Sequence, residues 1–296
     1  MNTYSVIVTY NPDWQAVRLL THQLSVSGVS TVIVDNSEVP LKDTTIDNSN
    51  IIFLGENKGI ATAQNVGIDY CLEQDADIIV FFDQDSVISE RFIEKLIAPI
   101  LNENENIVAP TFVDAEKGFI YPIVSVSKFG LRTKIIPSKN SASFYTNTAI
   151  SSGTAVKTSV FNIVGKMLDN LFIDYVDTEW CLRCHHAGIK VLILPDNQMI
   201  HSIGDKSFNV LGFTVPVHSA YRRYYRVRNS FVMLRLKHIP IFLGIREVTF
   251  SIIHQLLLVI TQKGKRKEYI KYGAIGLLHG IKGSKGKLEY IKKTGK

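Results

Sequence analysis

Cysteine and uninterrupted apolar runs are both scarce in this sequence. Three cysteines (Cys71, Cys181 and Cys184) among 296 residues are too few for a disulfide framework, so we expect a cytoplasmic protein. The longest charge-free apolar stretch in the C-terminal part spans about 15 residues between Glu247 and Lys263, whereas crossing a bilayer needs about 20. No basic segment followed by an apolar one opens the chain. We therefore expect neither a signal peptide nor a transmembrane helix.

Common cofactor motifs are also missing. The glycines around the start of the third expected helix fit neither G-x-G-x-x-G nor G-x-x-x-x-G-K-[ST], which excludes the dinucleotide and P-loop patterns there. The run from Cys181 to His185 matches the haem-attachment pattern C-x-x-C-H, but it lies inside a helical pattern in a chain without an export signal. No second C-x-x-C exists to complete a zinc site. We expect Cys181 and Cys184 to be half-buried helix residues.

Charge is distributed unevenly along the chain. From Tyr221 onward there are 18 Lys and Arg against three acids, a net charge of +15, while the first 220 residues carry −9. An acidic body with a basic tail predicts contact with an anionic surface. The tail mixes Lys and Arg with apolar clusters, which is typical of segments at a membrane interface. A helical subdomain or a homodimer interface with a solvated basic face is the alternative. No recognised motif supports nucleic acid.

The first 110 residues alternate short β-rich runs with segments of helical period, which predicts a parallel, doubly wound α/β sheet. A loop-rich insertion is expected over 111–150, then a helix over 177–187 and a strand over 191–194. Residues 1–217 are expected to form the main domain, and 218–296 a helical basic region. The strand candidates are 4–9, 31–35, 51–54, 78–82 and 107–109, and the helices between them are 13–27, 59–73 and 89–102.

Polar side chains follow four of these strands, at the sheet edge where ligands of such folds collect. Asp83 and Asp85 come directly after a fully apolar strand and could chelate Mg²⁺ or Mn²⁺, or simply cap the next helix. Asp35 could accept from the N3–H of a uracil or thymine ring, or form an Asx turn. Gly59 could let a phosphate approach a helix N-terminus.

Further along, Asp177 and Glu179 occupy the first turn of an expected helix, where its dipole stabilises a carboxylate or where an acid merely caps the helix. His201 follows the next strand, and a lone histidine is more often structural than a ligand. The basic aromatic run 221–229 could bind diphosphate oxygens and sugar rings, or be an ordinary basic helix.

Six motifs in order over residues 4–230 resemble the family-2 glycosyltransferases of the GT-A fold, and among them the bacterial rhamnosyltransferases of surface polysaccharide synthesis. The matching runs are Val8 to Pro12, Val34 to Ser37, Glu56 to Ala61 with Asn65 to Gly67, Asp83 to Asp85, Ser151 to Gly153 and Phe172 to Arg183. The resemblance implies a GT-A sheet flanked by helices, followed by the helical basic extension.

The resemblance also implies roles for single residues. Asp177 is implied as the catalytic base, with Glu179 as the alternative, because Val176 stands where many members have Glu. Asp85 with Asp83 and His201 would complete the site of Mg²⁺ or Mn²⁺. The expected contacts to the nucleotide sugar are Thr9, Tyr10, Asn11, Asp35, Asn57, Lys58, Gly59, Asn65, Asp83, Gln84, Gly153 and Arg228.

The expected reaction is an inverting transfer in which Asp177 deprotonates an acceptor hydroxyl and the cation neutralises the leaving diphosphate. The resemblance favours dTDP-β-L-rhamnose as donor and a polyprenyl-diphosphate-linked saccharide as acceptor, at the inner face of the cell membrane. UDP-galactofuranose or a UDP-hexose is the alternative donor. A silent nucleotide-sugar-binding or scaffold protein is the alternative from another class.

Overall fold

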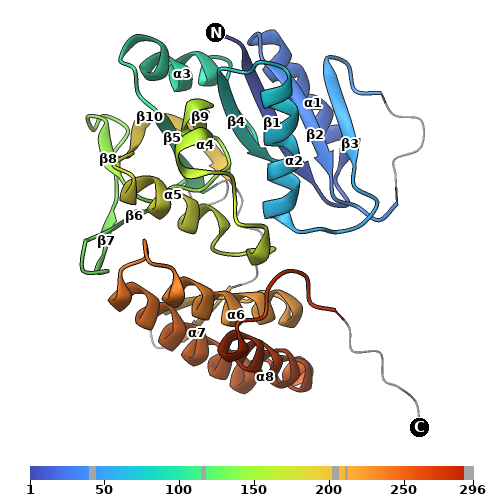
Figure 1. Cartoon of the computed structure of the whole chain (residues 1–296), viewed down its shortest axis with the longest axis vertical. Helices are drawn as coiled ribbons and strands as arrows, with labels where there is room; N and C mark the ends of the chain where they lie inside the picture. The colour runs from blue at the N-terminus through green and yellow to red at the C-terminus, as the bar shows by residue number, and fades with distance from the viewer. Residues whose placement is uncertain (40–44, 115–117, 202–206, 211–212, 290–296) are drawn as a thin grey trace.

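A computed structural model describes residues 1–39, 45–114, 118–201, 207–210 and 213–289. A central sheet with helices on both faces forms the N-terminal two thirds of the chain, and three helices form a separate layer beside it (Figure 1). The sheet has eight strands in the order β3-β2-β1-β4-β9-β5-β10-β8. Its strands are β1 (Thr3–Thr9), β2 (Ser30–Asp35), β3 (Ser49–Phe53), β4 (Ile78–Asp83), β5 (Ile107–Asp114), β8 (Phe144–Thr146), β9 (Ala155–Lys157) and β10 (Val191–His201).

The predicted parallel α/β sheet is confirmed, with two additions. The pairs β1–β2, β1–β4, β2–β3 and β5–β10 are parallel, whereas β9 runs antiparallel between β4 and β5, and β8 antiparallel to β10. Successive residues of a strand point to opposite faces, so Val6 and Ile7 enter different cores. One face is covered by α2 (Ile60–Glu73), α4 (Ser159–Val164) and α5 (Val176–His186), and the other by α1 (Trp14–Val26) and α3 (Phe92–Asn102).

The expected loop-rich insertion is only partly a loop. Strand β5 continues to Asp114, and a hairpin of β6 (Ile123–Val126) and β7 (Arg132–Ile135) follows before β8. These strands have three or four residues each and β7 is largely exposed, so they lack the apolar alternation that reveals a strand in a sequence. Strand β10 likewise runs on to His201, past a register shift between Leu194 and Gln198.

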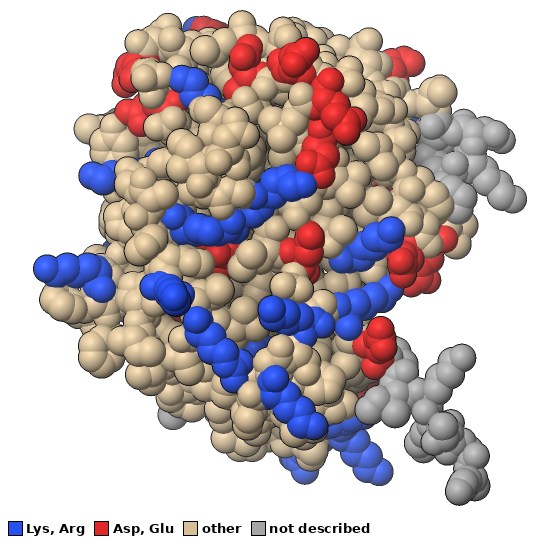
Figure 2. Space-filling view, viewed as in Figure 1, with Lys and Arg blue, Asp and Glu red and all other residues tan. Residues whose placement is uncertain are grey.

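The C-terminal layer consists of α6 (Ala220–Arg235), α7 (Ile241–Thr261) and α8 (Arg266–Lys282), with the short 3-10 turn η2 (Lys263–Lys265) between the last two. Another 3-10 turn, η1 (Asp169–Leu171), lies between α4 and α5. A two-stranded ribbon, β11 (Ser207–Val210) and β12 (Phe213–Pro216), precedes it. Helix α8 lies close to α6 because Gly276 faces Tyr224 and Gly280 faces Phe231. On the face shown in Figure 2, Lys and Arg gather toward this layer.

Helix α7 is longer than its charge-free stretch suggested, because it begins six residues before Glu247. Among the described residues it is the one helix long and apolar enough to cross a membrane, judged by length and composition alone. A third of its most apolar window is buried within the protein. The core helix of a soluble protein can have the same length and composition, so these two properties do not decide what the apolar residues of α7 contact.

Candidate active site

The carboxyl ends of β1, β2 and β4 lie side by side, so the predicted polar residues after these strands meet at one edge of the sheet. Thr9 is in register with Asp35, and Val8 with Asp83. The Thr9 hydroxyl donates to Asp35 Oδ1 at 3.0 Å, and the Ser37 hydroxyl donates to the same oxygen at 2.6 Å. Asp35 is only 2% exposed, and these hydrogen bonds are what make a buried carboxylate tolerable.

Two asparagines shape the loop that leads into α2. Asn57 Oδ1 accepts from Asn36 Nδ2 at 3.2 Å and from the Gly59 N–H at 3.0 Å. Asn36 Oδ1 accepts from the Lys58 N–H at 2.7 Å. The predicted contacts Asn57, Lys58 and Gly59 are therefore one ordered loop beside Asp35, with Lys58 exposed at the edge.

Gly59 permits a close contact within the protein, and its predicted approach to a phosphate stays a prediction. Its φ of 87° suits glycine, and a Cβ at this position would lie 2.5 Å from the carbonyl oxygen of Phe172. The close approach that glycine permits is thus to Phe172, whose ring stacks on Tyr225 of α6 with centroids 4.6 Å apart. The start of α2 is joined in this way to the C-terminal layer.

The loop after β1 is tied to its neighbours on both sides. The Tyr10 N–H donates to Gln84 Oε1 at 2.7 Å, and the Asn11 N–H donates to Ser37 Oγ at 2.8 Å. Asn11 has a φ of 46°, in the left-handed region that asparagine tolerates. These bonds bring Tyr10, Asn11 and Gln84 together with Asp35.

A turn before β9 supports the Asp83-Gln84-Asp85 element. Ser152 Oγ accepts from the Asp83 N–H at 3.1 Å and lies 2.9 Å from Ser86 Oγ. The Gly153 N–H donates to the Phe81 carbonyl at 2.6 Å, and a Cβ on Gly153 would collide with Met199. Gly153 therefore positions the element through its backbone.

Asp83 is half-buried and Asp85 is exposed at the end of β4. No group of three or more His, Cys, Asp or Glu that could hold a metal occurs among the described residues. Two carboxylates still fit a hard cation that takes its other ligands from phosphate and water. His201 ends β10 opposite Asp114, and the prediction for its side chain lies outside what the structure describes.

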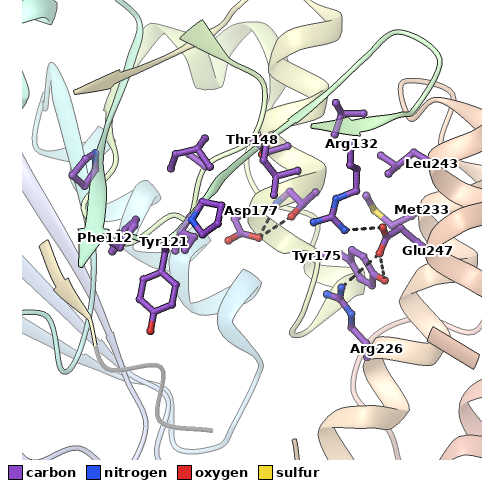
Figure 3. Close-up of a pocket in the computed structure, with 18 residues that line it drawn as sticks. Phe112, Tyr121, Arg132, Thr148, Tyr175, Asp177, Arg226, Met233, Leu243 and Glu247 are labelled. Atoms are coloured by element: carbon purple, nitrogen blue, oxygen red, sulfur yellow. Dashed lines mark hydrogen bonds and ion pairs between the residues drawn. The ribbon is translucent and has the colours of Figure 1, made fainter. Parts of the chain in front are cut away.

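Asp177 lies at the wall of a cavity of about 220 Å³ between the sheet and the C-terminal layer (Figure 3). It is the second residue of α5, and its Oδ1 accepts from the Thr178 N–H at 2.7 Å. Burial raises the pKa of this carboxyl above the ordinary value for aspartate. Phe172, Asp174 and Tyr175, just before α5, have φ between 65° and 67°. Three left-handed residues store backbone strain beside the acid.

A charge cluster that the sequence analysis missed lies at the opposite end of this cavity. Glu247 of α7 is within hydrogen-bonding or ion-pair distance of three guanidinium groups, those of Arg132 at 3.3 Å, Arg246 at 2.6 Å and Arg226 at 3.6 Å. The Arg226 guanidinium lies 3.9 Å from the centre of the Tyr175 ring. In Figure 3 the side chains of Arg132, Tyr175 and Arg226 converge on Glu247. The available signal was that Glu247 is one of only three acids after Tyr221.

Glu179 does not line this cavity, although it was the alternative base. It is fully buried, and Arg183 donates to its two oxygens at 3.0 and 2.9 Å. His238 Nε2 lies 2.8 Å from the same carboxylate. A carboxylate held in this way is part of the packing between α5 and the C-terminal layer, whereas Asp177 lines the cavity.

Asn65 and Arg228 are also structural. The Asn65 amide donates to the Met167 carbonyl at 2.9 Å and accepts from the Met167 N–H at 2.9 Å. Arg228 is fully buried and donates to the carbonyl oxygens of Asn170, Leu171 and Gly286. Because these groups are used within the protein, we revise the prediction that they contact a nucleotide sugar.

The three cysteines are free and buried, rather than half-buried as expected for the two in α5. Burial raises the pKa of Cys71 and Cys184 to about 12, so these thiols stay protonated near neutral pH. Cys181 and Cys184 therefore act as small apolar residues in the core.

Residues 6–155 match the model of glycosyl transferase family 2. The whole chain is similar to "dTDP-rhamnosyl transferase RfbF" of Shigella flexneri, with 50% identity over 96% of this chain and 97% of that protein. It is also 23% identical to "Low-salt glycan biosynthesis hexosyltransferase Agl10" of Haloferax volcanii, over 96% of this chain and 92% of that one.

Two solved structures share the fold. One is S. aureus TarS 1-349 in complex with UDP-GlcNAc, with a TM-score of 0.57 and 12% identity over 95% of this chain and 82% of that one. The other is GalNAc-T7 with UDP, GalNAc and Mn²⁺, with a TM-score of 0.54 and 12% identity over 95% of this chain and 56% of that one. The predicted α/β fold with a helical C-terminal extension is confirmed.

Proposed function

The chain belongs to glycosyl transferase family 2, and we propose that it moves L-rhamnose from dTDP-β-L-rhamnose to a lipid-linked saccharide with inversion at the anomeric carbon. The observation that carries the donor assignment is the 50% identity to a dTDP-rhamnosyl transferase along nearly the whole of both chains. That similarity includes α6, α7 and α8, so it extends to the side of the cavity that these helices form. We propose that the reaction takes place at the inner face of the cell membrane.

The sheet edge at Asp35 suits the nucleotide. The hydrogen bonds from Thr9 and Ser37 all reach Asp35 Oδ1. Oδ2 takes none of them, and it is the acceptor that would receive the N3–H of a thymine ring. Uracil has the same N3–H, so this contact selects a pyrimidine of this type rather than the sugar.

Asp83 and Asp85 would hold Mg²⁺ or Mn²⁺ against the donor diphosphate. When bound, the cation neutralises charge on the leaving diphosphate. The backbone of this element is fixed by Ser152 through the Asp83 N–H, so the two carboxylates are supported before the donor arrives.

Asp177 would act as the general base toward the acceptor. Its Oδ atoms take the proton of an acceptor hydroxyl, while that oxygen forms a bond to the anomeric carbon and the bond from this carbon to the diphosphate breaks. The products are the glycoside and dTDP. A raised pKa favours this role, because a carboxylate of higher pKa is a stronger base toward a hydroxyl.

The cavity beside Asp177 is the acceptor site in this proposal. Its walls combine apolar residues such as Phe112 and Leu243 with the polar groups Arg132, Tyr175 and Thr148. A sugar ring presents apolar C–H faces and hydroxyl groups, and both kinds of wall suit it. The C-terminal layer therefore contributes to acceptor selection.

A donor screen tests the function. Purified protein is incubated with a divalent cation, an acceptor extract and dTDP-rhamnose, UDP-galactofuranose or a UDP-hexose, and release of the nucleoside diphosphate is measured. Release from dTDP-rhamnose alone, absent with Asp177→Asn, is the expected result. Preference for a UDP-sugar would overturn the donor assignment. UDP-hexoses are included because one relative of this chain is named as a hexosyltransferase. Release from no donor would indicate a silent binding protein.

A further inference from the structure

Helix α7 has polar residues on its buried face and apolar residues on its exposed face, the reverse of an ordinary surface helix. Its buried face carries three polar residues, Glu247, Ser251 and Gln255, next to Leu243, Gly244 and Leu258. Its outer face is apolar. The exposed large hydrophobic residues of α7 are Ile241, Phe242, Ile245, Phe250, Ile253, Leu256 and Ile260. A helix whose outer side faces water has the opposite arrangement.

Glu247 and Gln255 on this buried face are held by their partners, so α7 cannot rotate its apolar side inward. Arg223 of α6 is 1% exposed and donates to Gln255 Oε1 at 3.0 Å and to the Ser251 carbonyl at 2.8 Å. Gln255 in turn donates to the Tyr269 carbonyl of α8 at 2.6 Å. Turning the helix would leave a buried guanidinium without acceptors, which costs far more than it gains.

The tip of the β6–β7 hairpin adjoins the first turn of α7. Gly130 lies so near Leu243 that a Cβ at Gly130 would overlap the Leu243 backbone. Its neighbours Phe129 and Leu131 are 60% and 68% exposed. We call these two residues and the seven exposed residues of α7 the apolar face. On a protein that is surrounded only by water, exposed hydrophobic residues are normally scattered singly, whereas the apolar face gathers them on one helix and the adjoining turn.

Cations flank the apolar face at both ends. Lys128 and Lys237 are exposed near the start of α7. After its last residue come four exposed cations, Lys263, Lys265, Arg266 and Lys267, with Glu268 as the adjoining acid. This charge disfavours a dimer in which two apolar faces pack together, because each copy would bring a region of net charge +15 to the interface.

We propose that the apolar face inserts into the interface of an anionic lipid bilayer, with α7 lying in the membrane plane and the flanking Lys and Arg on the headgroups. Apolar side chains then leave water, and the cations meet charges of opposite sign. Lying in the plane keeps the buried Arg223 and Glu247 in their protein surroundings. A spanning α7 would have to carry the charged α6 and α8 into the bilayer.

This orientation brings the lipid surface next to the acceptor cavity. Leu243 of α7 and Arg132 of β7 line that cavity, and the residues of the apolar face lie on α7 and in the turn directly before β7. The identity of the lipid-borne substrate rests on the proposed function, whereas lipid binding itself does not. The two can therefore fail separately.

The test measures binding of the full-length protein to vesicles of phosphatidylcholine alone or with one third phosphatidylglycerol, by co-sedimentation without donor. A triple variant, Phe250→Ser with Ile253→Ser and Leu256→Ser, removes the centre of the apolar face. A matched control, Leu19→Ser with Val26→Ser and Ile163→Ser, removes apolar residues that are at least as exposed from the N-terminal part of the chain. A third variant changes Lys263, Lys265 and Lys267 to Gln.

We expect the partition coefficient on anionic vesicles to fall at least tenfold in the apolar triple variant and severalfold in the lysine variant, and to be unchanged in the control. Hydrolysis of a soluble donor should stay at the wild-type rate in all three, which reports that the site is folded. The proposal would be overturned if the apolar triple variant bound vesicles as well as the wild type does. It would also be overturned if the wild type bound neutral and anionic vesicles equally, or if it formed a dimer through the apolar face and bound no vesicles. Resistance of bound protein to alkaline extraction would replace the in-plane geometry by a spanning one. Vesicle binding without rhamnosyl transfer would refute only the proposed function.

Discussion

Glu247 of α7 accepts a hydrogen bond of 2.9 Å from the hydroxyl of Tyr175, which lies two residues before Asp177. These partners are 72 positions apart in the sequence, yet their contact joins the C-terminal layer to the turn that presents Asp177. The same carboxylate is close to Arg132 and Arg226, which line the cavity beside Asp177. The helices after residue 218 thus form part of the wall of that cavity.

Glu247→Gln should weaken both the fold and acceptor use. It keeps a side chain of the same shape but leaves three guanidinium groups without their carboxylate. We expect a loss of about 2 kcal/mol in the free energy of unfolding, less than for a fully buried pair because the arginines are one-third exposed. The KM for the acceptor should rise while binding of the donor stays unchanged. Urea unfolding and steady-state kinetics measure these effects, with Glu268→Gln as control; equal behaviour of the two variants would contradict the assignment.

Asp177→Asn should strongly reduce turnover while leaving donor binding intact. A general base contributes about 10²- to 10⁴-fold to a rate, so kcat should fall within that range. Calorimetric titration with the nucleoside diphosphate should give the wild-type Kd. Turnover at the wild-type rate would remove Asp177 from its role as base.

The raised pKa of Asp177 has a consequence for stability with a definite sign. In the unfolded chain this carboxyl has its ordinary, lower pKa, so the ionised form is destabilising in the folded protein at neutral pH. Asp177→Asn should therefore unfold at a higher temperature than the wild type at pH 7. The gap should narrow as the pH falls through the raised pKa. The acid limb of kcat/KM should lie above the ordinary pKa of aspartate. A lower Tm for the variant at pH 7 would contradict this.

Glu179→Gln should lower stability and leave turnover nearly unchanged, the reverse of the pattern expected for Asp177→Asn. Its partners Arg183 and His238 lose a buried carboxylate, and we expect a loss of about 3 kcal/mol in unfolding free energy. At a temperature where the variant stays folded, its kcat should remain close to that of the wild type. A loss of turnover comparable to that of Asp177→Asn, without loss of stability, would return the catalytic role to Glu179.

Donor hydrolysis should depend on Mg²⁺ or Mn²⁺ through Asp83 and Asp85. Excess chelator should suppress it, and returning either cation should restore it. Asp85→Asn should raise the cation concentration needed for half-maximal activity, whereas Asp75→Asn, a change of another aspartate away from the site, should not. Full activity in excess chelator would remove the metal assignment.

The sequence was sufficient for the first half of the sheet and for its polar edge, because buried strands that end in Thr9, Asp35 and Asp83 leave a local pattern. The roles of Asn65 and Arg228 were not predictable in this way. Their side chains form hydrogen bonds with backbone groups of residues 167–174, which are far away in the sequence. Only tertiary packing brings these groups together. The same holds for Glu247, whose burial among arginines depends on how α7 meets β7 and α6.

Helix α7 also shows why residue type alone misleads in the tail. Its mixture of apolar and basic residues suggested a membrane interface or a helical subdomain, but not that Glu247 and Gln255 lie inside, where Gln255 accepts from Arg223. The hairpin β6–β7 was missed for a different reason, since strands of four residues with exposed side chains carry no periodic signal.

The position of β9 in the sheet has a consequence for the order in which this protein is built on the ribosome. Ile78 of β4 pairs with Lys157 of β9, and Ile107 of β5 pairs with Val156, so β9 fills a gap between two strands synthesised much earlier. Contacts this distant in the chain form late. Ser152 and Gly153, which support the Asp83 turn, arrive with the same segment. The nascent chain therefore cannot form the hydrogen bond that supports Asp83 until Ser152 has emerged, and the place between β4 and β5 stays empty until residue 157 follows.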